Sequence, residues 1–189
     1  MSDPVLVNRI EAVARAAMEP KRFAHCRSTG MLARRLCSRF GQDADKGFIA
    51  GVFHDAARDA SLPELIAMVE RDGLPISAED RRHPQVLHGR AAAVMLSERT
   101  GYEEQDVLWA IRDHVTGRPS MGPLSRIVLV SDYLEPTRDF LEEAFRLRIL
   151  TLDLDAMVRE VIAGKIAYVR SIHEPVAEAS LALKGELDR

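Results

Sequence analysis

The sequence predicts an all-α fold in a single domain covering residues 1–189. Apolar residues recur at spacings of three and four along almost the whole chain, and the alternation typical of β-strands is nearly absent. A chain of 189 residues fits one domain with a sizeable core. The composition, 47% hydrophobic and 29% charged, is that of an ordinary globular protein.

The first half of the chain predicts five helices. An amphipathic stretch predicts a helix over about residues 3–18, and Gly41 ends a second one over about 22–40. Asp43 is the expected N-cap of a helix over about 43–56. Ser61 caps a helix over about 61–72, where Pro63 fits the first turn because its missing N–H costs little there. The fifth helix, about 86–100, ends at Gly101.

The second half predicts five more helices, over about residues 104–116, 122–134, 141–150 and 153–173, with a short one near 175–184. The loop Thr116–Pro123 separates the first two of these, and Pro136 precedes the third. No internal repeat, low-complexity segment or linker interrupts the pattern. Cys26 and Cys37 fall on one helix about 16 Å apart, too far for a disulfide, and are interpreted as packing residues.

Charge and hydropathy exclude several classes of function. The formal net charge is −3, which gives no reason to expect nucleic acid or an anionic membrane as a partner. No apolar run approaches the roughly 18 residues of a membrane span. The first residues lack the basic-then-apolar layout of a signal peptide, so a cytoplasmic location is expected. A homodimer is left open.

Ligand-type side chains lie on the apolar faces of five expected helices. His25 shares a stripe with Leu32 and Leu36, and Asp132 follows Val128 and Leu129 inside an apolar helix. The His-Asp pair at residues 54 and 55 ends the apolar stretch "FIAGVF", where an uncompensated carboxylate would cost several kcal/mol. The full set is His25, His54, Asp55, His88, His114 and Asp132.

A bound cation is the simplest explanation of this set. One histidine on an apolar face is most often a core residue satisfied by its neighbours, and one aspartate can cap a helix or pair with an arginine. Six such groups would each need a separate solution, whereas a shared metal satisfies all of them. Imidazole and carboxylate together suit Zn, Fe, Mn or Ni. His83, in a polar stretch, and His173, at a helix end, are not expected to be ligands.

The order of these residues resembles the HD superfamily of metal-dependent phosphohydrolases in its six-ligand form. The resemblance extends from about Lys21 to Arg148. The stretches "KRFAHCRSTG", "AGVFHDAAR", "LHG", "AIRDHVTGRPSM" and "SDYLEPTR" are similar to the bacterial YqeK-type branch, the symmetrical bis(5'-nucleosyl)-tetraphosphatases. Members of that branch hydrolyse diadenosine tetraphosphate to two ADP.

The resemblance implies a single HD-domain helical bundle with a core of about residues 18–150 and C-terminal helices, 153–184, packed on it. It implies a first metal held by His25, His54, Asp55 and Asp132. His88 and His114 either hold a second metal or contact the substrate. The expected cofactor is a divalent metal, one or two ions, with iron first and manganese, zinc, cobalt or nickel as alternatives.

The resemblance also implies the catalytic roles. Asp55, His88 and His114 are the expected catalytic residues, acting with a metal-activated water that attacks an inner phosphorus. Arg58 stands where the family usually has lysine, which keeps the charge. Beside the two histidines, the residues expected to contact the nucleotide substrate are Lys21, Arg22, Arg58, Thr116, Gly117, Arg118, Tyr133 and Arg138.

Two alternatives remain open on the sequence alone. The nearer is an HD-domain nucleotidase or phosphodiesterase that acts on another nucleotide with the same metal. The more distant is a non-catalytic HD-like module that binds partners, although such modules usually lack some of the metal ligands and this chain has all six.

Overall fold

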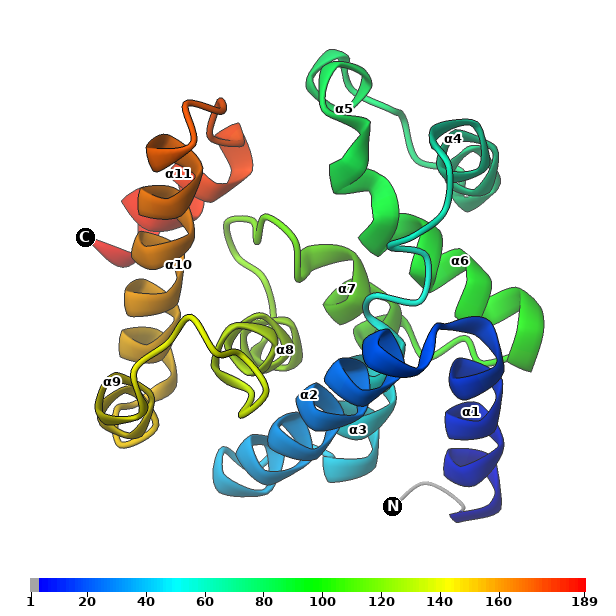
Figure 1. Ribbon diagram of the computed structural model, residues 1–189, viewed down its shortest axis with the longest axis horizontal. Coiled ribbons are helices and arrows are strands. Elements are labelled where there is room, and N and C mark those ends of the chain that lie inside the picture. Colours follow the sequence, from blue (N-terminus) through cyan, green and yellow to red (C-terminus); the bar gives the residue numbers. More distant parts are fainter. Residues whose placement is uncertain (1–3) are drawn as a thin grey trace.

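The computed structural model describes residues 4–189, and in that part of the chain it contains helices and no strand (Figure 1). The all-α prediction is therefore confirmed. The α-helices are α1 (Pro4–Ala17), α2 (Pro20–Arg39), α3 (Ala44–Phe53), α4 (Leu62–Val69), α5 (Ala78–Arg82), α6 (His88–Thr100), α7 (Gln105–Asp113), α8 (Pro123–Leu134), α9 (Glu143–Ile149), α10 (Leu154–Ser171) and α11 (Glu178–Leu187). Two short 3-10 helices, η1 (Glu70–Asp72) and η2 (Pro84–Leu87), adjoin α4 and α6.

The expected caps of α3 and α4 are confirmed. Asp43 accepts hydrogen bonds from the backbone N–H groups of Asp45 and Lys46, which satisfies donors that the first turn of a helix leaves unpaired. At the start of α4, the carboxylate of Glu64 accepts from the N–H of Ser61 at 2.7 Å. The expected start of α1 at residue 3 lies outside the described residues.

The structure differs from the prediction at one short helix, α5, and in the bounds of the last helix. Helix α5 was not expected, because its five residues carry no apolar stripe; the Ser77–Asp80 capping box begins it instead. The last helix spans Glu178–Leu187, three residues later than the predicted 175–184. The chain turns before it, at His173, whose φ of 60° lies in the left-handed region.

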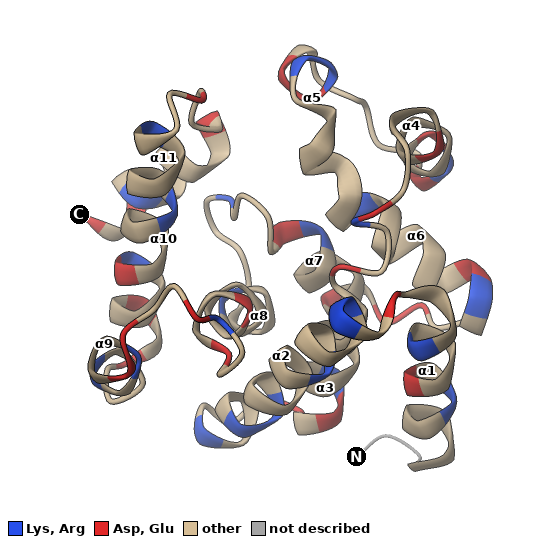
Figure 2. Cartoon of the chain, viewed as in Figure 1, with Lys and Arg blue, Asp and Glu red and all other residues tan. Residues whose placement is uncertain are grey.

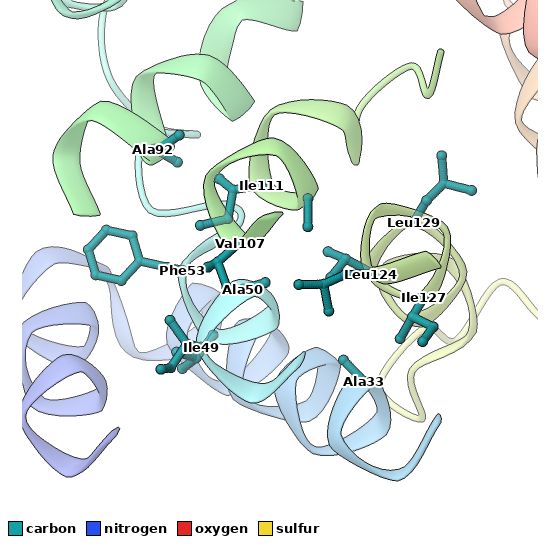
Figure 3. Close-up of a cluster of buried hydrophobic side chains, with 14 of the residues drawn as sticks. Ala33, Ile49, Ala50, Phe53, Ala92, Val107, Ile111, Leu124, Ile127 and Leu129 are labelled. Atoms are coloured by element: carbon teal, nitrogen blue, oxygen red, sulfur yellow. The ribbon is translucent and has the colours of Figure 1, made fainter. Parts of the chain in front are cut away.

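Helix α3 lies at the centre of the molecule. Every residue from Gly47 to Phe53 is buried, and α1, α2, α7 and α8 all pack against it. Figure 3 shows its Ile49, Ala50 and Phe53 among side chains of these neighbours. A helix that is apolar on all sides is buried on all sides, so the residues that directly follow α3 arrive in the interior.

Helices α2 and α3 approach closely because two glycines face each other. A Cβ on Gly51 would lie 2.6 Å from the Cα of Gly30 and 2.7 Å from its nitrogen. These are backbone atoms, which can move aside only if the two helices separate. The contact therefore fixes the position along α2 at which the C-terminal end of α3 packs.

We expect Gly51→Ala to lower the free energy of unfolding by about 2–3 kcal/mol, the cost of overpacking a core. Gly185→Ala in α11 is the matched control, because a Cβ there meets no atom within 4 Å. That change should leave stability unaltered or raise it by up to about 1 kcal/mol, since alanine favours helix. Urea unfolding of both variants in the presence of a chelator measures the difference. Equal stabilities would show that the interface adapts.

Of the last two helices, α10 packs on α8 and α11 packs on α10. Helix α10 contacts both α8 and α11, and a Cβ on Gly164 of α10 would overlap the Tyr133 hydroxyl of α8. This close approach brings Lys165, the next residue of α10, against the centre of the molecule. Cys26 and Cys37 are both free and buried, and burial raises the pKa of the Cys37 thiol to about 12, which agrees with their interpretation as packing residues.

Charged residues of both signs are interspersed along most helices (Figure 2). Within residues 4–189, no helix combines the length and the apolar character that a membrane span requires.

Candidate metal centre

The His-Asp pair lies where α3 ends. The helix stops at Phe53, three residues earlier than expected, and a series of turns carries the chain from His54 to Asp59. In these turns the side chains of His54 and Asp55 reach the same site. A continuous helix would have directed them about 100° apart. Both are buried, His54 completely.

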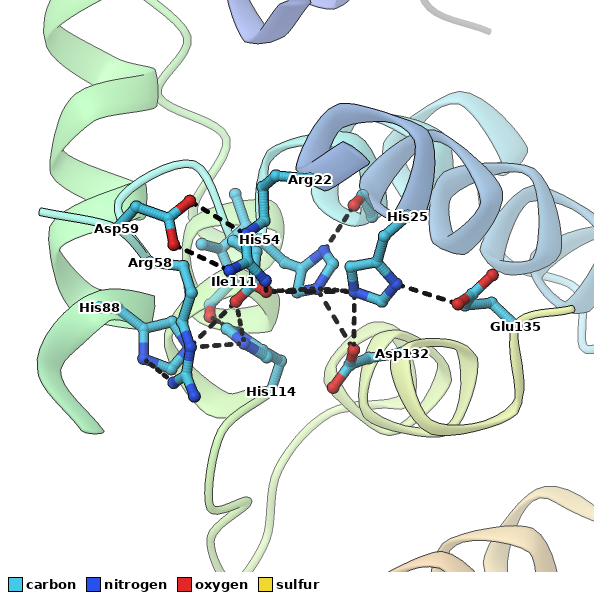
Figure 4. A network of polar contacts seen from close by, with 12 residues as sticks. Arg22, His25, His54, Arg58, Asp59, His88, Ile111, His114, Asp132 and Glu135 are labelled. Atoms are coloured by element: carbon cyan, nitrogen blue, oxygen red, sulfur yellow. Dashed lines mark hydrogen bonds and ion pairs between the residues drawn. The ribbon is translucent and has the colours of Figure 1, made fainter. Parts of the chain in front are cut away.

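A first group of ligand atoms comes from α2, from the turn after α3 and from α8 (Figure 4). The Nε2 atoms of His25 and His54 are 3.3 Å apart. Asp132 Oδ1 lies 3.2 Å from the Nε2 atom of His25 and 3.4 Å from that of His54. Three side chains from helices that are distant in sequence therefore point their ligand atoms at one position.

A second group comes from the same turn and from α6 and α7. Asp55 Oδ1 lies 3.1 Å from His88 Nε2 and 3.5 Å from His114 Nε2. The two histidine nitrogens are 3.2 Å apart. His88 and His114 are both at most 3% exposed.

Asp55 connects the two groups. Its Oδ1 atom faces the second group, while its Oδ2 atom lies 4.0 Å from His25 Nε2 and 3.9 Å from His54 Nε2. The imidazole rings of His54 and His114 also approach, with centroids 4.7 Å apart. One carboxylate with an oxygen toward each group is the geometry that can bridge two ions.

Hydrogen bonds fix which nitrogen each histidine offers. The Nδ1 atoms of His54, His88 and His114 lie 2.6–2.7 Å from the backbone oxygens of Gly51, Gln85 and Ile111. A carbonyl only accepts, so each Nδ1 donates and its Nε2 is free to bind a metal. His25 Nδ1 donates in the same way to Glu135 Oε1 at 3.0 Å.

This donor pattern fits a divalent metal. In these tautomers the neutral rings turn unprotonated Nε2 atoms toward each other at 3.2 and 3.3 Å, and facing lone pairs repel unless a cation or a proton lies between them. Three groups of ligand residues have all their candidate atoms within 4.8 Å: His25, His54 and Asp55; His54, His114 and Asp132; Asp55, His88 and His114. Imidazole with carboxylate suits first-row transition metals.

The pKa values show the same demand for positive charge. Burial opposes ionisation of Asp55, but the charge on His54 and the close His114 and His88 hold the pKa of Asp55 well below the usual range. The pKa of Asp132 is also well below the usual range, because the effect of His25 and His54 outweighs that of burial. Both carboxylates are therefore ionised at neutral pH.

Without metal, protons supply the positive charge. Burial would lower the pKa of His54, but Cys26, Asp55 and Asp132 around it raise that pKa well above the usual value. Burial lowers the pKa of His114 to about 4, and the neighbouring His54 and His88 add to this. These directions favour a second proton on His54 in the metal-free protein and a neutral His114.

We expect metal binding to the metal-free protein to release protons near pH 7, because His54 must lose its Nε2 proton before it can bind a metal. The raised pKa of His54 favours this proton near neutral pH, so metal affinity should rise with pH there. Calorimetric titration in two buffers of different ionisation enthalpy counts the protons. A heat independent of the buffer would mean that His54 is already neutral.

Four basic side chains surround the ligand atoms. Arg22 donates to Asp55 Oδ2 at 3.0 Å and holds Asp59 with its other nitrogens. Arg138 donates to Asp132 and lies 3.3 Å from His25 Nε2. An Nη atom of Arg58 lies 3.0 Å from His88 Nδ1. The fourth is Lys165, 3.9 Å from Asp132 Oδ2.

Several residues predicted to bind substrate have other partners. The Gly117 N–H donates to the Asp113 oxygen at 2.7 Å, and a Cβ there would meet Leu183 of α11. Thr116 donates its hydroxyl to the Gly117 oxygen. Arg118 donates to Asp113 and lies over the Trp109 ring. These contacts fold the loop after α7 against its neighbours and do not direct it at the ligand atoms.

The remaining predicted residues lie at the edge of the site or outside it. Lys21 is exposed in the first turn of α2. Tyr133 is half-buried with its hydroxyl toward Gly164, and burial raises its pKa. His83 and His173 belong to none of the ligand groups found in the described part of the chain.

Sequence reasoning missed two residues of the site. Glu135 is fully buried and orients His25. Burial alone would raise the pKa of Glu135, but hydrogen bonds from His25 and Thr137 lower it to about 2. Lys165 donates to the His114 oxygen at 2.9 Å, and burial lowers its pKa. Glu135 has a local signal, a carboxylate just beyond an apolar helix and before a proline. Lys165 has no such signal, because it lies on α10, a separate helix that the chain reaches only after α9.

The fold and the site together define a class, that of helical proteins built around a buried histidine–aspartate cluster able to hold a metal. The HD domain model matches residues 22–137, so the chain belongs to the HD domain family, whose members depend on a metal. The expectations of an HD domain and of a hydrolase are thereby confirmed.

Similar proteins are also named as hydrolases. The symmetrical bis(5'-nucleosyl)-tetraphosphatase of Bacillus subtilis (strain 168) is 30% identical over 90% of this chain and 92% of its own length. That of Halalkalibacterium halodurans is 30% identical over 88% of both. A crystal structure from Clostridium acetobutylicum, described as a predicted HD superfamily hydrolase involved in NAD metabolism, superposes with a TM-score of 0.88, 27% identity and 96% coverage of both chains.

Proposed function

We propose that the protein hydrolyses diadenosine tetraphosphate, or a related dinucleoside polyphosphate, symmetrically to two ADP. The observation that carries the proposal is a mostly buried cluster of six ligand-type residues surrounded by four basic side chains. Such a site suits a substrate that brings several negative charges to a metal. The relatives of similar length named as symmetrical tetraphosphatases support this substrate class.

The proposed ligands of the first metal are His25, His54, Asp55 and Asp132, and those of the second are Asp55, His88 and His114. Iron is the proposed native metal. A bound divalent metal supplies a Lewis acid for a phosphoryl oxygen and lowers the pKa of a water molecule toward neutrality.

The chain's own residues orient these groups and balance the charge. Asp55 presents one oxygen to each ligand group and holds the groups at a fixed separation. Glu135 and the carbonyl oxygens of Gly51, Gln85 and Ile111 keep the four imidazole rings in place through their Nδ1 protons.

Arginines receive the phosphate chain. Arg58 and Arg138 lie on opposite sides of the cluster, one beside His88 and the other beside His25. Both have exposed surface, and their planar forks suit phosphate oxygens. Lys165 adds a compact positive charge on the α10 side.

The test is hydrolysis by protein purified without chelator or histidine tag and analysed for its metals. Diadenosine tetraphosphate should give ADP as the sole nucleotide product, separated by ion-exchange chromatography. Equal amounts of AMP and ATP would show asymmetric cleavage. Faster hydrolysis of a mononucleotide or a cyclic nucleotide would replace this proposal with another HD phosphohydrolase activity.

We expect Arg58→Ala and Arg138→Ala each to weaken binding of ADP and of the tetraphosphate about ten- to a hundredfold, with metal content unchanged. A hydrogen bond to a charged group is worth about 1.5–3 kcal/mol, which corresponds to that loss. Arg58→Lys should be milder, because it keeps the charge and loses only the fork. Arg81→Ala, an exposed arginine of α5, is the control.

Calorimetry with AMP, ADP and the tetraphosphate measures the effect. The loss should grow with phosphate number, since a longer chain reaches more basic side chains. Equal losses for AMP and the tetraphosphate would favour a nucleotidase, and no loss would exclude both arginines from the phosphate site.

A further inference from the structure

One large aromatic side chain is exposed next to the metal centre. Phe140 lies in the connection between α8 and α9 and is 60% exposed. Single exposed apolar residues are common on protein surfaces, so exposure alone implies nothing. The position of this ring beside a basic side chain of the site suggests a role in ligand binding.

Phe140 is joined to the ligand atoms through one arginine. The guanidinium carbon of Arg138 lies 5.8 Å from the centroid of the Phe140 ring. The same guanidinium contacts His25 Nε2 at 3.3 Å and donates to Asp132. The exposed ring is thus one side chain away from the metal centre, on the side where phosphate would be held.

The Phe140 ring is held in a defined orientation. Tyr133 meets it edge-on, with centroids 5.7 Å apart and planes at 69°, and Tyr133 is itself fixed because its hydroxyl packs against Gly164 of α10. Arg138 is anchored as well, since its Nε donates to the Asp132 backbone oxygen at 3.0 Å. A supported aromatic ring that keeps more than half of its surface in water is suited to stack on a flat ligand.

We propose that Phe140 is the stacking platform for a nucleobase of the substrate, with Tyr133 as its support and Arg138 on the adjoining phosphate. This inference rests on the proposed function. In a nucleotide the base is separated from its first phosphate by one ribose, so phosphate bound at Arg138 brings the base beyond that arginine, toward the solvent side where Phe140 lies. A metal centre and arginines recognise only phosphate; an aromatic ring adds recognition of the nucleoside.

The platform also predicts the kind of specificity. Stacking uses the π-face that every base has and involves no hydrogen-bond donor or acceptor. Replacing adenine by guanine in the substrate should therefore change KM only a few-fold, whereas removing the base should change it strongly.

The experiment compares two ligands on the metal-loaded protein, ADP and inorganic pyrophosphate. Phe140→Ala should weaken ADP binding about tenfold or more, the effect of losing one base–aromatic stack, and leave pyrophosphate binding and metal content unchanged. Phe140→Trp should restore ADP binding, and Phe140→Leu should not, because it is apolar but has no aromatic face. Leu147→Ala, which alters a similarly exposed apolar residue of α9, is the matched control.

The outcomes separate this inference from the proposed function. If wild-type protein binds ADP no better than pyrophosphate and does not hydrolyse the tetraphosphate, the proposed function fails. If wild-type protein prefers ADP and Phe140→Ala keeps that preference, only the platform is excluded. A loss of pyrophosphate binding or metal in Phe140→Ala would also overturn it, since the ring would then act by shielding the Arg138–Asp132 pair.

Discussion

Replacing Asp132 by alanine is expected to remove the bound metal and abolish hydrolysis. The change deletes a proposed ligand whose oxygen lies within 3.4 Å of two histidine nitrogens. It also leaves Arg138 and Lys165 beside the metal position without the carboxylate that they now contact, and two uncompensated positive charges disfavour a cation there. Both losses act in the same direction.

Elemental analysis of the purified variant measures the metal directly, and circular dichroism checks that the helices remain. Asp139→Ala is the matched control, because Asp139 is exposed in the connection that follows α8; it should keep full metal content. Asp132→Asn separates charge from shape and should lose metal too. Full occupancy in Asp132→Ala would remove Asp132 from the ligand set.

The meeting of these six side chains could be predicted because polar residues on apolar helix faces leave a clear sequence signal. His25, His88 and Asp132 each fall in register with buried residues of their own helix, and local periodicity alone shows this. What periodicity could not show is that the helix before His54 stops at Phe53, so that the pair lies in turns. The close Gly30–Gly51 contact that fixes this end involves two helices.

The substrate side was less predictable for a physical reason. Arg118 and Gly117 follow His114 within four residues in sequence, and the resemblance implies that both contact the substrate. In the fold, Asp113 takes the guanidinium of Arg118, and the N–H of Gly117 closes the end of α7. Lys165 reaches the site from α10, an element that no local motif connects to the cluster. Long-range packing, not the motif, selects which basic side chains face the proposed metal site.

The two ligand groups suggest different roles for two histidines that local sequence cannot distinguish. His54 is within 3.4 Å of His25 and Asp132 in the first group, and His114 is within 3.5 Å of His88 and Asp55 in the second. If the first group holds the tighter metal, losing His54 removes that ion, and the bridging Asp55 then has no partner ion to stabilise the second.

We therefore expect His54→Ala to contain no metal, and His114→Ala to keep at least one ion per chain while turnover falls by orders of magnitude. His114→Ala keeps its backbone oxygen for Lys165, so this variant should fold. His83→Ala, which alters a histidine outside the cluster, should match wild type in metal and activity. Metal counted per chain together with single-turnover rates tests the assignment. A metal-free His114→Ala beside a metal-containing His54→Ala would mean that the tighter ion belongs to His88, His114 and Asp55.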